Sequence, residues 1–93
     1  MICSFKDKWT EAILHGVAPR GFPEIVLQRA RRKLTMIQHA TSLKDLLAPP
    51  ANRLEALQGD RKGQHSIRIN DQWRVCFIWT EAGAKQVEIT DYH

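Results

Sequence analysis

The sequence has little cysteine and no long apolar run. Its two cysteines, Cys3 and Cys76, lie near opposite ends of the chain and lack the close spacing of metal ligands. No segment stays apolar over the roughly 20 residues that a membrane-spanning helix needs, and the N-terminal residues do not resemble a signal peptide. We therefore expect a reduced, cytoplasmic protein with no membrane partner, no metal site and no cofactor.

Charge and length narrow the class of protein. The chain has 14 Lys and Arg residues against 10 Asp and Glu, a formal net charge of +4. This excess favours an acidic or polyanionic partner, although many small basic proteins bind none. Hydrophobic residues make up 43% and charged residues 26%, which is typical of globular rather than disordered proteins. A chain of 93 residues can build one small core, so we expect a single domain over residues 1–93.

The N-terminal half is predicted to be mainly helical, after a short strand over residues 1–5. Asp7 can cap a first helix, and Pro23 suits the first position of a longer one. Ser42, followed by Asp45, has the pattern of a capping box and predicts a third, brief helix. Apolar residues recur at helical spacing along the long helix, at Val26, Leu27, Ala30, Leu34 and Ile37.

The C-terminal half alternates with a period of two, which predicts strands. Residues 64–69 and 73–79 form a predicted hairpin with a three-residue connection. This register sets apolar side chains opposite one another on one face and places Arg68 beside Arg74 on the other face. A two-residue turn would set Ile67 against an arginine, so we reject it.

The order of elements predicts an α+β fold. Short strands over residues 53–57 and 86–90 complete the pattern of one strand, then helices, then a strand meander. We expect the helices to pack on one face of a small, mainly antiparallel sheet. The residues expected on that face are Ile67, Ile69, Trp73, Val75, Phe77, Val87 and Ile89.

Two arginines form a candidate phosphate site. Arg68 and Arg74 would lie directly opposite each other, which disfavours folding unless an anion bridges them. The planar fork of arginine suits a phosphate, and a cation here would stabilise the extra negative charge of a phosphorane transition state. Such a site needs no metal. The alternative is a solvated polar face without function.

The last three residues supply groups for proton transfer. Asp91, Tyr92 and His93 end the final strand with an acid, an aromatic hydroxyl and an imidazole. By strand alternation Asp91 shares the face of His93, where it can orient the imidazole or raise its pKa. Tyr92 can stack on an unpaired base. The alternative is a frayed, idle terminus.

Glu55 is a further candidate, because its side chain points away from Leu54 in the short predicted strand. Most such glutamates are solvated. If Glu55 faces the arginines instead, it becomes a candidate general base. His65 falls on the apolar face of the hairpin, and we interpret it as a histidine at the edge of the core.

These segments together resemble the HigB toxins of the RelE/ParE superfamily. They are residues 52–57 (NRLEAL), 59–61 (GDR), 66–74 (SIRINDQWR) and 91–93 (DYH). The similarity extends to the opening residues 2–5 and to residues 31–34, so it covers nearly the whole chain. The Asn-Asp-Gln-Trp-Arg turn combined with the Asp-Tyr-His end is specific, whereas either piece alone would be weak.

The resemblance implies a RelE-like, microbial-ribonuclease-like α+β fold and cleavage of messenger RNA in the ribosomal A site. It also implies neutralisation by a helix-turn-helix antitoxin of the HigA type, so that DNA is contacted only through the antitoxin. The family's catalytic set coincides with Arg74, Asp91, Tyr92 and His93. Glu55 stands where some members have histidine, so the base at that position differs from theirs.

The implied reaction gives each residue a role. The 2′-hydroxyl of the RNA attacks the neighbouring phosphate, which requires one base and one acid. We expect His93 to act as acid or base, Asp91 to orient it and Arg74 to bind the phosphate. Tyr92 stacks or lends its hydroxyl, and Glu55 is the weaker candidate for the second proton transfer. The residues expected to contact phosphates of messenger or ribosomal RNA are Arg61, Lys62 and Arg68.

Two rival functions fit a basic fold of this class. ParE-type relatives poison DNA gyrase without cleaving RNA, and the Asp-Tyr-His end argues against that class. The second rival is a non-catalytic module that binds RNA or the ribosome. Such a module would tolerate the loss of His93 but would lose binding when its basic residues are neutralised.

Overall fold

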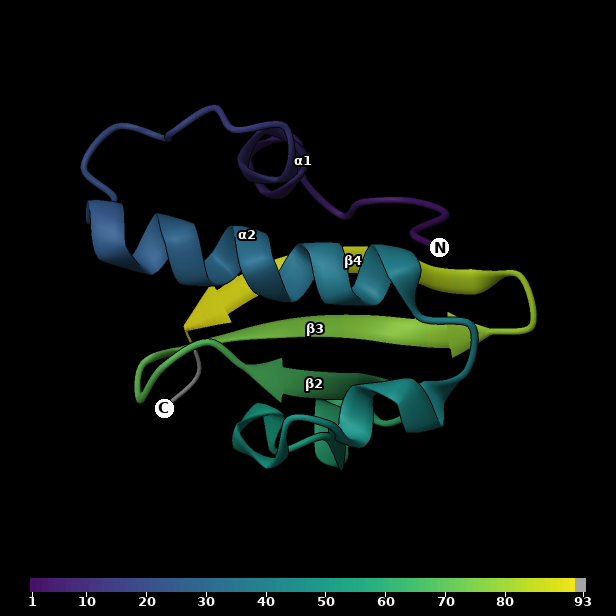
Figure 1. Cartoon of the computed structure of the whole chain (residues 1–93). Coiled ribbons are helices and arrows are strands. Elements are labelled where there is room, and N and C mark those ends of the chain that lie inside the picture. Colours follow the sequence, from purple (N-terminus) through teal and green to yellow (C-terminus); the bar gives the residue numbers. More distant parts are fainter. Residues whose placement is uncertain (92–93) are drawn as a thin grey trace.

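The computed structural model of the chain describes residues 1–91 (Figure 1). Its helices are α1 (Lys8–Leu14), α2 (Glu24–His39) and the 3-10 helices η1 (Leu43–Leu47), η2 (Pro50–Asn52) and η3 (Gly59–Arg61). Its strands are β1 (Glu55–Ala56), β2 (His65–Arg68), β3 (Trp73–Thr80) and β4 (Gly83–Asp91). The strands form one antiparallel sheet in the order β1-β2-β3-β4, which confirms the predicted α+β fold. Within residues 1–91, no helix is long and apolar enough to cross a membrane.

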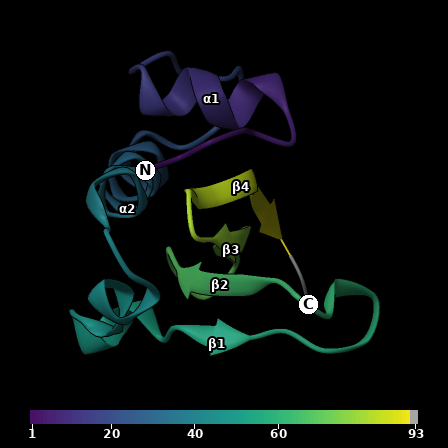
Figure 2. The ribbon, with the colours of Figure 1, turned by 90° about the vertical axis from the view of Figure 1, so that its right-hand side faces the viewer.

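The helices α1 and α2 lie on one side of the sheet, as predicted. Figure 2 shows α2 end-on beside the sheet, with α1 resting on α2 and reaching β4. The apolar residues of α2 pack against the alternating apolar residues of the strands. Helical spacing places the first group on one face of α2, and strand alternation places the second group on the sheet face that meets it. The buried residues of this contact are Val26, Ala30, Leu34, Ile37, Ile67, Ile69, Val75, Phe77, Val87 and Ile89. Leu27 and Trp73 lie at its edge and are partly buried.

The hairpin between β2 and β3 has the predicted register. Ile67 is paired with Val75, and the backbone N–H at position 69 donates to the carbonyl of Trp73 over 2.9 Å. The side chain of Asn70 stabilises the turn by accepting from the N–H groups of Gln72 (2.8 Å) and Trp73 (2.7 Å). This side-chain bonding is typical of asparagine in turns and fixes the connection.

The prediction of a continuous strand over residues 1–5 is wrong. Ile2 and Phe5 make only isolated parallel bridges with β4. The cause lies in β4, where Gln86 has a φ of 53° at a shift of register against β3. The N–H of Gln86 donates to the side chain of Ser4 over 2.9 Å. A regular ladder cannot continue past this irregularity.

The predicted strand over residues 53–57 shortens to β1. Arg53 ends η2 in the left-handed conformation, with φ 46° and ψ 53°, so the extended segment begins later. The N–H of Leu57 still donates to the carbonyl of Gln64 over 2.9 Å. β1 is therefore the short outer strand that carries Glu55 beside β2.

The N-terminus is fixed against the turn between β3 and β4. The amino group of Met1 donates to the carbonyl of Ala40 over 3.1 Å, at the end of α2. Gly83 has a φ of +129°, and a Cβ at this position would lie 2.1 Å from the carbonyl oxygen of Met1. Only glycine permits this close approach of two backbone segments.

Candidate active site

The sheet face opposite the helices is polar. Strand alternation directs to it the side chains that lie between the core residues, namely Ser66, Arg68, Arg74, Cys76, Glu88 and Thr90. Glu55 is paired with Ser66 and brings a carboxylate from β1 to the same face. Arg68 and Arg74 are cross-strand partners, as the sequence predicted.

Arg74 is the most firmly held side chain of this face. Its Nε donates to Oγ of the buried Ser66 over 2.8 Å, and its Nη2 donates to the carbonyl of Arg53 over 2.7 Å. Nη2 also lies 3.5 Å from Oε1 of Glu55, and the side chain is 13% exposed. Arg74 is therefore not a solvated arginine, because three groups fix the orientation of its guanidinium.

The carbonyl that binds Arg74 is fixed by the turn around Asn52. The Asn52 side chain is fully buried, donates to the carbonyl of Leu46 over 3.2 Å and accepts from Nζ of Lys33. The left-handed conformation of Arg53 follows at once and turns its carbonyl toward β3. The end of η2 thus contributes to the site through its backbone.

Arg68 has an acidic partner of its own. Its guanidinium forms an ion pair with Asp71 in the hairpin turn, and this hydrogen-bonded contact lowers the pKa of the Asp71 carboxyl. Glu55 is the corresponding acidic partner of Arg74. The two carboxylates offset part of the repulsion between the paired arginines.

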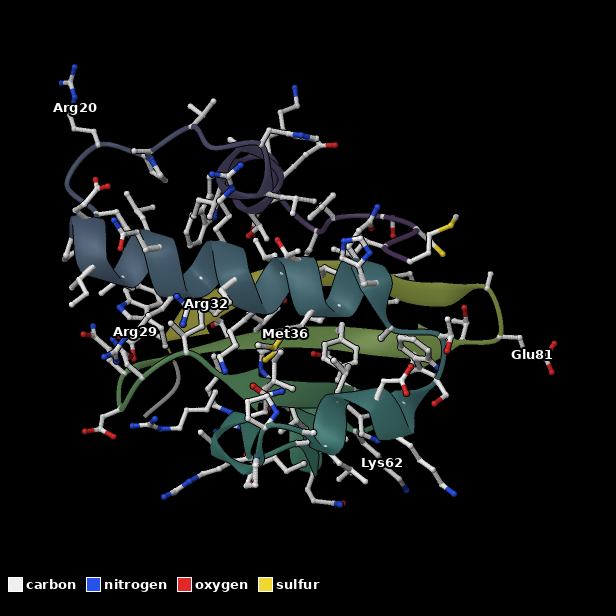
Figure 3. All side chains as sticks on the ribbon, viewed as in Figure 1. Arg20, Arg29, Arg32, Met36, Lys62 and Glu81 are labelled. Carbon is white, nitrogen blue, oxygen red and sulfur yellow. The ribbon has the colours of Figure 1, made fainter. Side chains whose placement is uncertain are left out.

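Arg61 occupies the other side of the polar face. Its Nη1 lies 3.1 Å from Oε1 of Gln64 and 3.5 Å from Oε2 of Glu88, which also pairs with Lys6 over 3.0 Å. Arg61 thereby holds the η3 turn against β4, a structural contact that the sequence did not predict. Lys62, the next residue, is exposed (Figure 3).

Cys76 is fully buried on β3, where it is paired with Ser66. Burial raises the pKa of its thiol to about 11, although the guanidinium groups of Arg61 and Arg74 act in the opposite direction. The carboxylates of Glu88 and Glu55 raise that pKa further. The thiol is therefore neutral at physiological pH and is no nucleophile.

Asp91 ends β4 on the other face of the sheet from Arg74. Strand alternation places its side chain on the side of the helices, where it accepts from Nε2 of Gln72 over 3.0 Å. The structure thus groups Glu55 with the arginines of the polar face and places Asp91 at the adjacent edge. The predicted catalytic residues Tyr92 and His93 lie outside the described residues.

Sequence reasoning missed two contributors to the site. Ser66 lies two residues before Arg68, so the alternation that placed Arg68 on the polar face could have placed Ser66 there as well. The carbonyl of Arg53 could not be found in this way. Its direction depends on a left-handed backbone, which arginine rarely adopts and the sequence does not signal.

Comparison with known proteins identifies the family. The model of a RelE-like toxin of the type II toxin–antitoxin system HigB matches residues 3–93. The chain belongs to the HigB-like toxin family. Toxin HigB-1 of Vibrio cholerae is 39% identical over 85 residues, which make up 90% of each chain. Endoribonuclease HigB of Proteus vulgaris is 31% identical over 93 residues, which make up 100% of both chains.

A solved structure supports the fold. The YoeB–YefM complex from Staphylococcus aureus contains a chain similar to this one, with a TM-score of 0.63 and 18% identity. The match covers 100% of this chain and 95% of that chain. The RelE-like fold implied by the sequence is thereby confirmed. As a member of a type II toxin family, the chain has an antitoxin as its partner.

Proposed function

We propose that the chain is an endoribonuclease that cleaves messenger RNA in the ribosomal A site and so inhibits translation. Membership of the HigB-like family and the name of the Proteus vulgaris relative support this function. The observation that carries the proposal is the fixed guanidinium of Arg74 beside the exposed carboxylate of Glu55. This pair places a cation and a proton acceptor on one accessible face.

The proposed reaction uses the RNA's own nucleophile. A base removes the proton of the 2′-hydroxyl, and the 2′-oxygen forms a bond to the adjacent phosphorus. The bond between phosphorus and the 5′-oxygen breaks, and an acid protonates that oxygen. The products are a 2′,3′-cyclic phosphate and a 5′-hydroxyl, with no change of oxidation state. The side chains named below supply every proton transfer, so the reaction needs no metal ion.

Arg74 stabilises the transition state in this reaction. The phosphorane carries one more negative charge than the substrate, so a preorganised cation binds it more tightly than the ground state. Ser66 and the carbonyl of Arg53 hold the guanidinium before RNA arrives. Removing one preorganised interaction of this kind costs enzymes about a hundredfold or more in rate.

The proton transfers are assigned to Glu55, which lies beside Arg74, and to the residues at the end of the chain. His93 acts as acid or base, and Asp91 orients its imidazole. Glu55 performs the complementary proton transfer, because its carboxylate is exposed on β1 and RNA can approach it. Tyr92 stacks on a base or lends its hydroxyl.

The partners follow from the same proposal. A helix-turn-helix antitoxin of the HigA type neutralises the toxin in the cytoplasm and provides any contact with DNA. Ribosomal RNA binds through basic side chains, including Arg68, Lys62 and the partly exposed Arg61. Contacts to RNA phosphates release counterions, so we expect binding to the ribosome to weaken as salt rises.

The test uses purified toxin and ribosomes carrying a defined message. We expect cleavage in the A-site codon, a 2′,3′-cyclic phosphate at the new end, and no cleavage when the nucleotide 5′ of the cut is 2′-deoxy. Cleavage of the deoxy message would exclude the 2′-hydroxyl mechanism. An intact message, with translation unaffected and replication stalled, would replace this function by gyrase poisoning.

A further inference from the structure

A basic pocket lies between α2 and the end of β2, beside the turn that leads to β3. Its volume is about 180 Å³, and its lining residues are Arg29, Arg32, Lys33, Ala51, Arg68 and Ile69. A cavity needs only about 10–15 Å³ of such volume to hold one water molecule, so this pocket has room for several. Figure 3 shows Arg29 and Arg32 on the side of α2 that faces the hairpin. The pocket can therefore admit a small anionic group.

The positive charges of this pocket act on one another. Burial lowers the pKa of Lys33, and the charges of Arg32, Arg68 and Arg29 lower it further. Among residues 1–91, no carboxylate belongs to the lining. Asp71 pairs with Arg68 at the rim, where the Asp71 side chain is exposed. The field inside the pocket is therefore strongly positive.

This arrangement costs stability. Arg29, Arg32 and Lys33 lie on one helix face at spacings of three and four residues, where like charges repel. Lys33 is fixed by its bond to Asn52, so it cannot turn away into solvent. Arg29 and Arg32 have no ion pair within residues 1–91. A bound anion would remove the repulsion, and the forked guanidinium groups match the oxygens of a phosphate.

The position of Arg68 connects the pocket to the proposed active site. Arg68 lines the pocket and is the cross-strand partner of Arg74, and paired residues lie roughly 5 Å apart between Cα atoms. A phosphate chain that leaves the pocket past Arg68 therefore runs toward Arg74. This continuity favours a nucleic acid strand over an isolated anion.

We propose that the pocket of Arg29, Arg32, Lys33 and Arg68 binds a phosphodiester group of RNA other than the one that is cleaved. The proposal rests on the proposed function, because it takes RNA as the ligand. The pocket holds the RNA strand beside the polar face while Arg74 acts on the scissile phosphate. The phosphodiester belongs either to ribosomal RNA or to the message, and the two share the same chemistry.

The test compares two double variants. Arg29→Gln with Arg32→Gln removes two exposed charges from the pocket and leaves Lys33 and Arg68 in place. The control is Arg20→Gln with Lys44→Gln, which removes the same charge from exposed sites outside the lining. Affinity is measured over a salt series, for empty ribosomes and for ribosomes carrying a message made non-cleavable by a 2′-deoxy nucleotide.

We expect the pocket variant to bind about tenfold more weakly than the control near 0.1 M salt. Its slope of log affinity against log salt should be smaller by roughly 0.7–0.9 for each phosphate that the variant no longer neutralises. Weaker binding to empty ribosomes assigns the pocket to ribosomal RNA. Weaker binding that appears only with message present assigns it to messenger RNA. Either result supports the proposal.

Equal affinity and equal slope for the two double variants would overturn the proposal. So would weakening confined to antitoxin binding, measured in parallel, because the pocket would then recognise an acidic protein surface. Binding to a non-cleavable message does not depend on cleavage. The pocket proposal and the nuclease proposal can therefore be refuted independently of each other. A parent protein that cleaves RNA while both variants bind alike overturns the pocket alone. Pocket-dependent binding without cleavage by the parent overturns the nuclease alone.

Discussion

Arg74 on β3 and Glu55 on β1 meet across β2, with Nη2 and Oε1 3.5 Å apart. Ser66 of β2 lies between them and accepts a hydrogen bond from Nε of Arg74 over 2.8 Å. One guanidinium therefore joins three strands of the sheet. This geometry makes Arg74 a structural residue as well as the proposed catalytic one, so a change at this position affects both stability and activity.

The Arg74→Lys substitution tests whether the fixed geometry of the guanidinium matters in addition to its positive charge. Lysine keeps the cation but loses the fork that binds Ser66 and the carbonyl of Arg53 at once. We expect cleavage on programmed ribosomes to fall about a hundredfold. The free energy of unfolding in urea should fall by about 1–3 kcal/mol, because the buried Ser66 hydroxyl loses the hydrogen bond from Nε of Arg74. Arg20→Lys serves as the control and should match the parent in both measurements.

Gly83→Ala should be far more damaging than Gly21→Ala. Both glycines have positive φ, so both substitutions strain the backbone, at a cost of about 1–2 kcal/mol. Only at Gly83 would the new methyl group meet the backbone of Met1, at 2.1 Å. We therefore expect a distinctly lower melting temperature for Gly83→Ala. Equal melting temperatures would show that the N-terminus is not held at this turn.

The two thiols should react at very different rates. Cys3 is exposed, whereas Cys76 is buried and burial raises the pKa of its thiol to about 11. Because the thiolate is the reactive form, iodoacetamide at about pH 8 should modify only Cys3 in the native protein. Mass spectrometry should find Cys76 modified after unfolding in urea. Rapid native labelling of Cys76 would contradict the burial of its thiol.

Asp45 should contribute to stability at neutral pH and lose that contribution in acid. Hydrogen bonds from the N–H groups of Thr41 and Ser42 lower the pKa of its carboxyl below the ordinary value of 3.8. A carboxyl whose pKa is lower in the folded than in the unfolded state stabilises the fold at pH values above its unfolded pKa. That stabilisation is lost as pH falls through the pKa of the folded state. Asp45→Asn should be less stable than the parent at pH 7, and the difference should shrink as pH falls through the lowered pKa of Asp45. If the free energies of unfolding of the parent and of Asp45→Asn differed by the same amount at every pH, this role of Asp45 would be refuted.

The register of the hairpin was predictable because two constraints agree. The alternation that sets Ile67 opposite Val75 requires the three-residue turn, and Asn70 supplies the hydrogen bonds of that turn. The apolar face of α2 was predictable for a similar reason, because the apolar residues that recur at helical spacing in the sequence are mostly the residues buried in the structure. The family was predictable from two short motifs, one in the hairpin and one at the C-terminus.

The partners of the site residues were not predictable in this way. Whether Glu55 meets Arg74 depends on where η2 ends, and that is set by the left-handed backbone at Arg53. Arg61 was expected to contact RNA phosphates, but the fold brings Glu88 to within 3.5 Å of it. Charge and alternation give the face on which a side chain lies. Which neighbours it meets there depends on turns whose backbone the sequence does not specify.

We propose that this chain cleaves RNA and that His93 is a catalytic group. The most direct measurement is the single-turnover cleavage rate of an A-site message by the parent protein and by His93→Ala, after matched urea curves show that both are folded. We predict cleavage by the parent, a loss of at least about a hundredfold in the variant, and equal ribosome binding by both. Equal cleavage rates would exclude His93 from catalysis, and a folded parent that leaves the message intact would contradict the nuclease function itself.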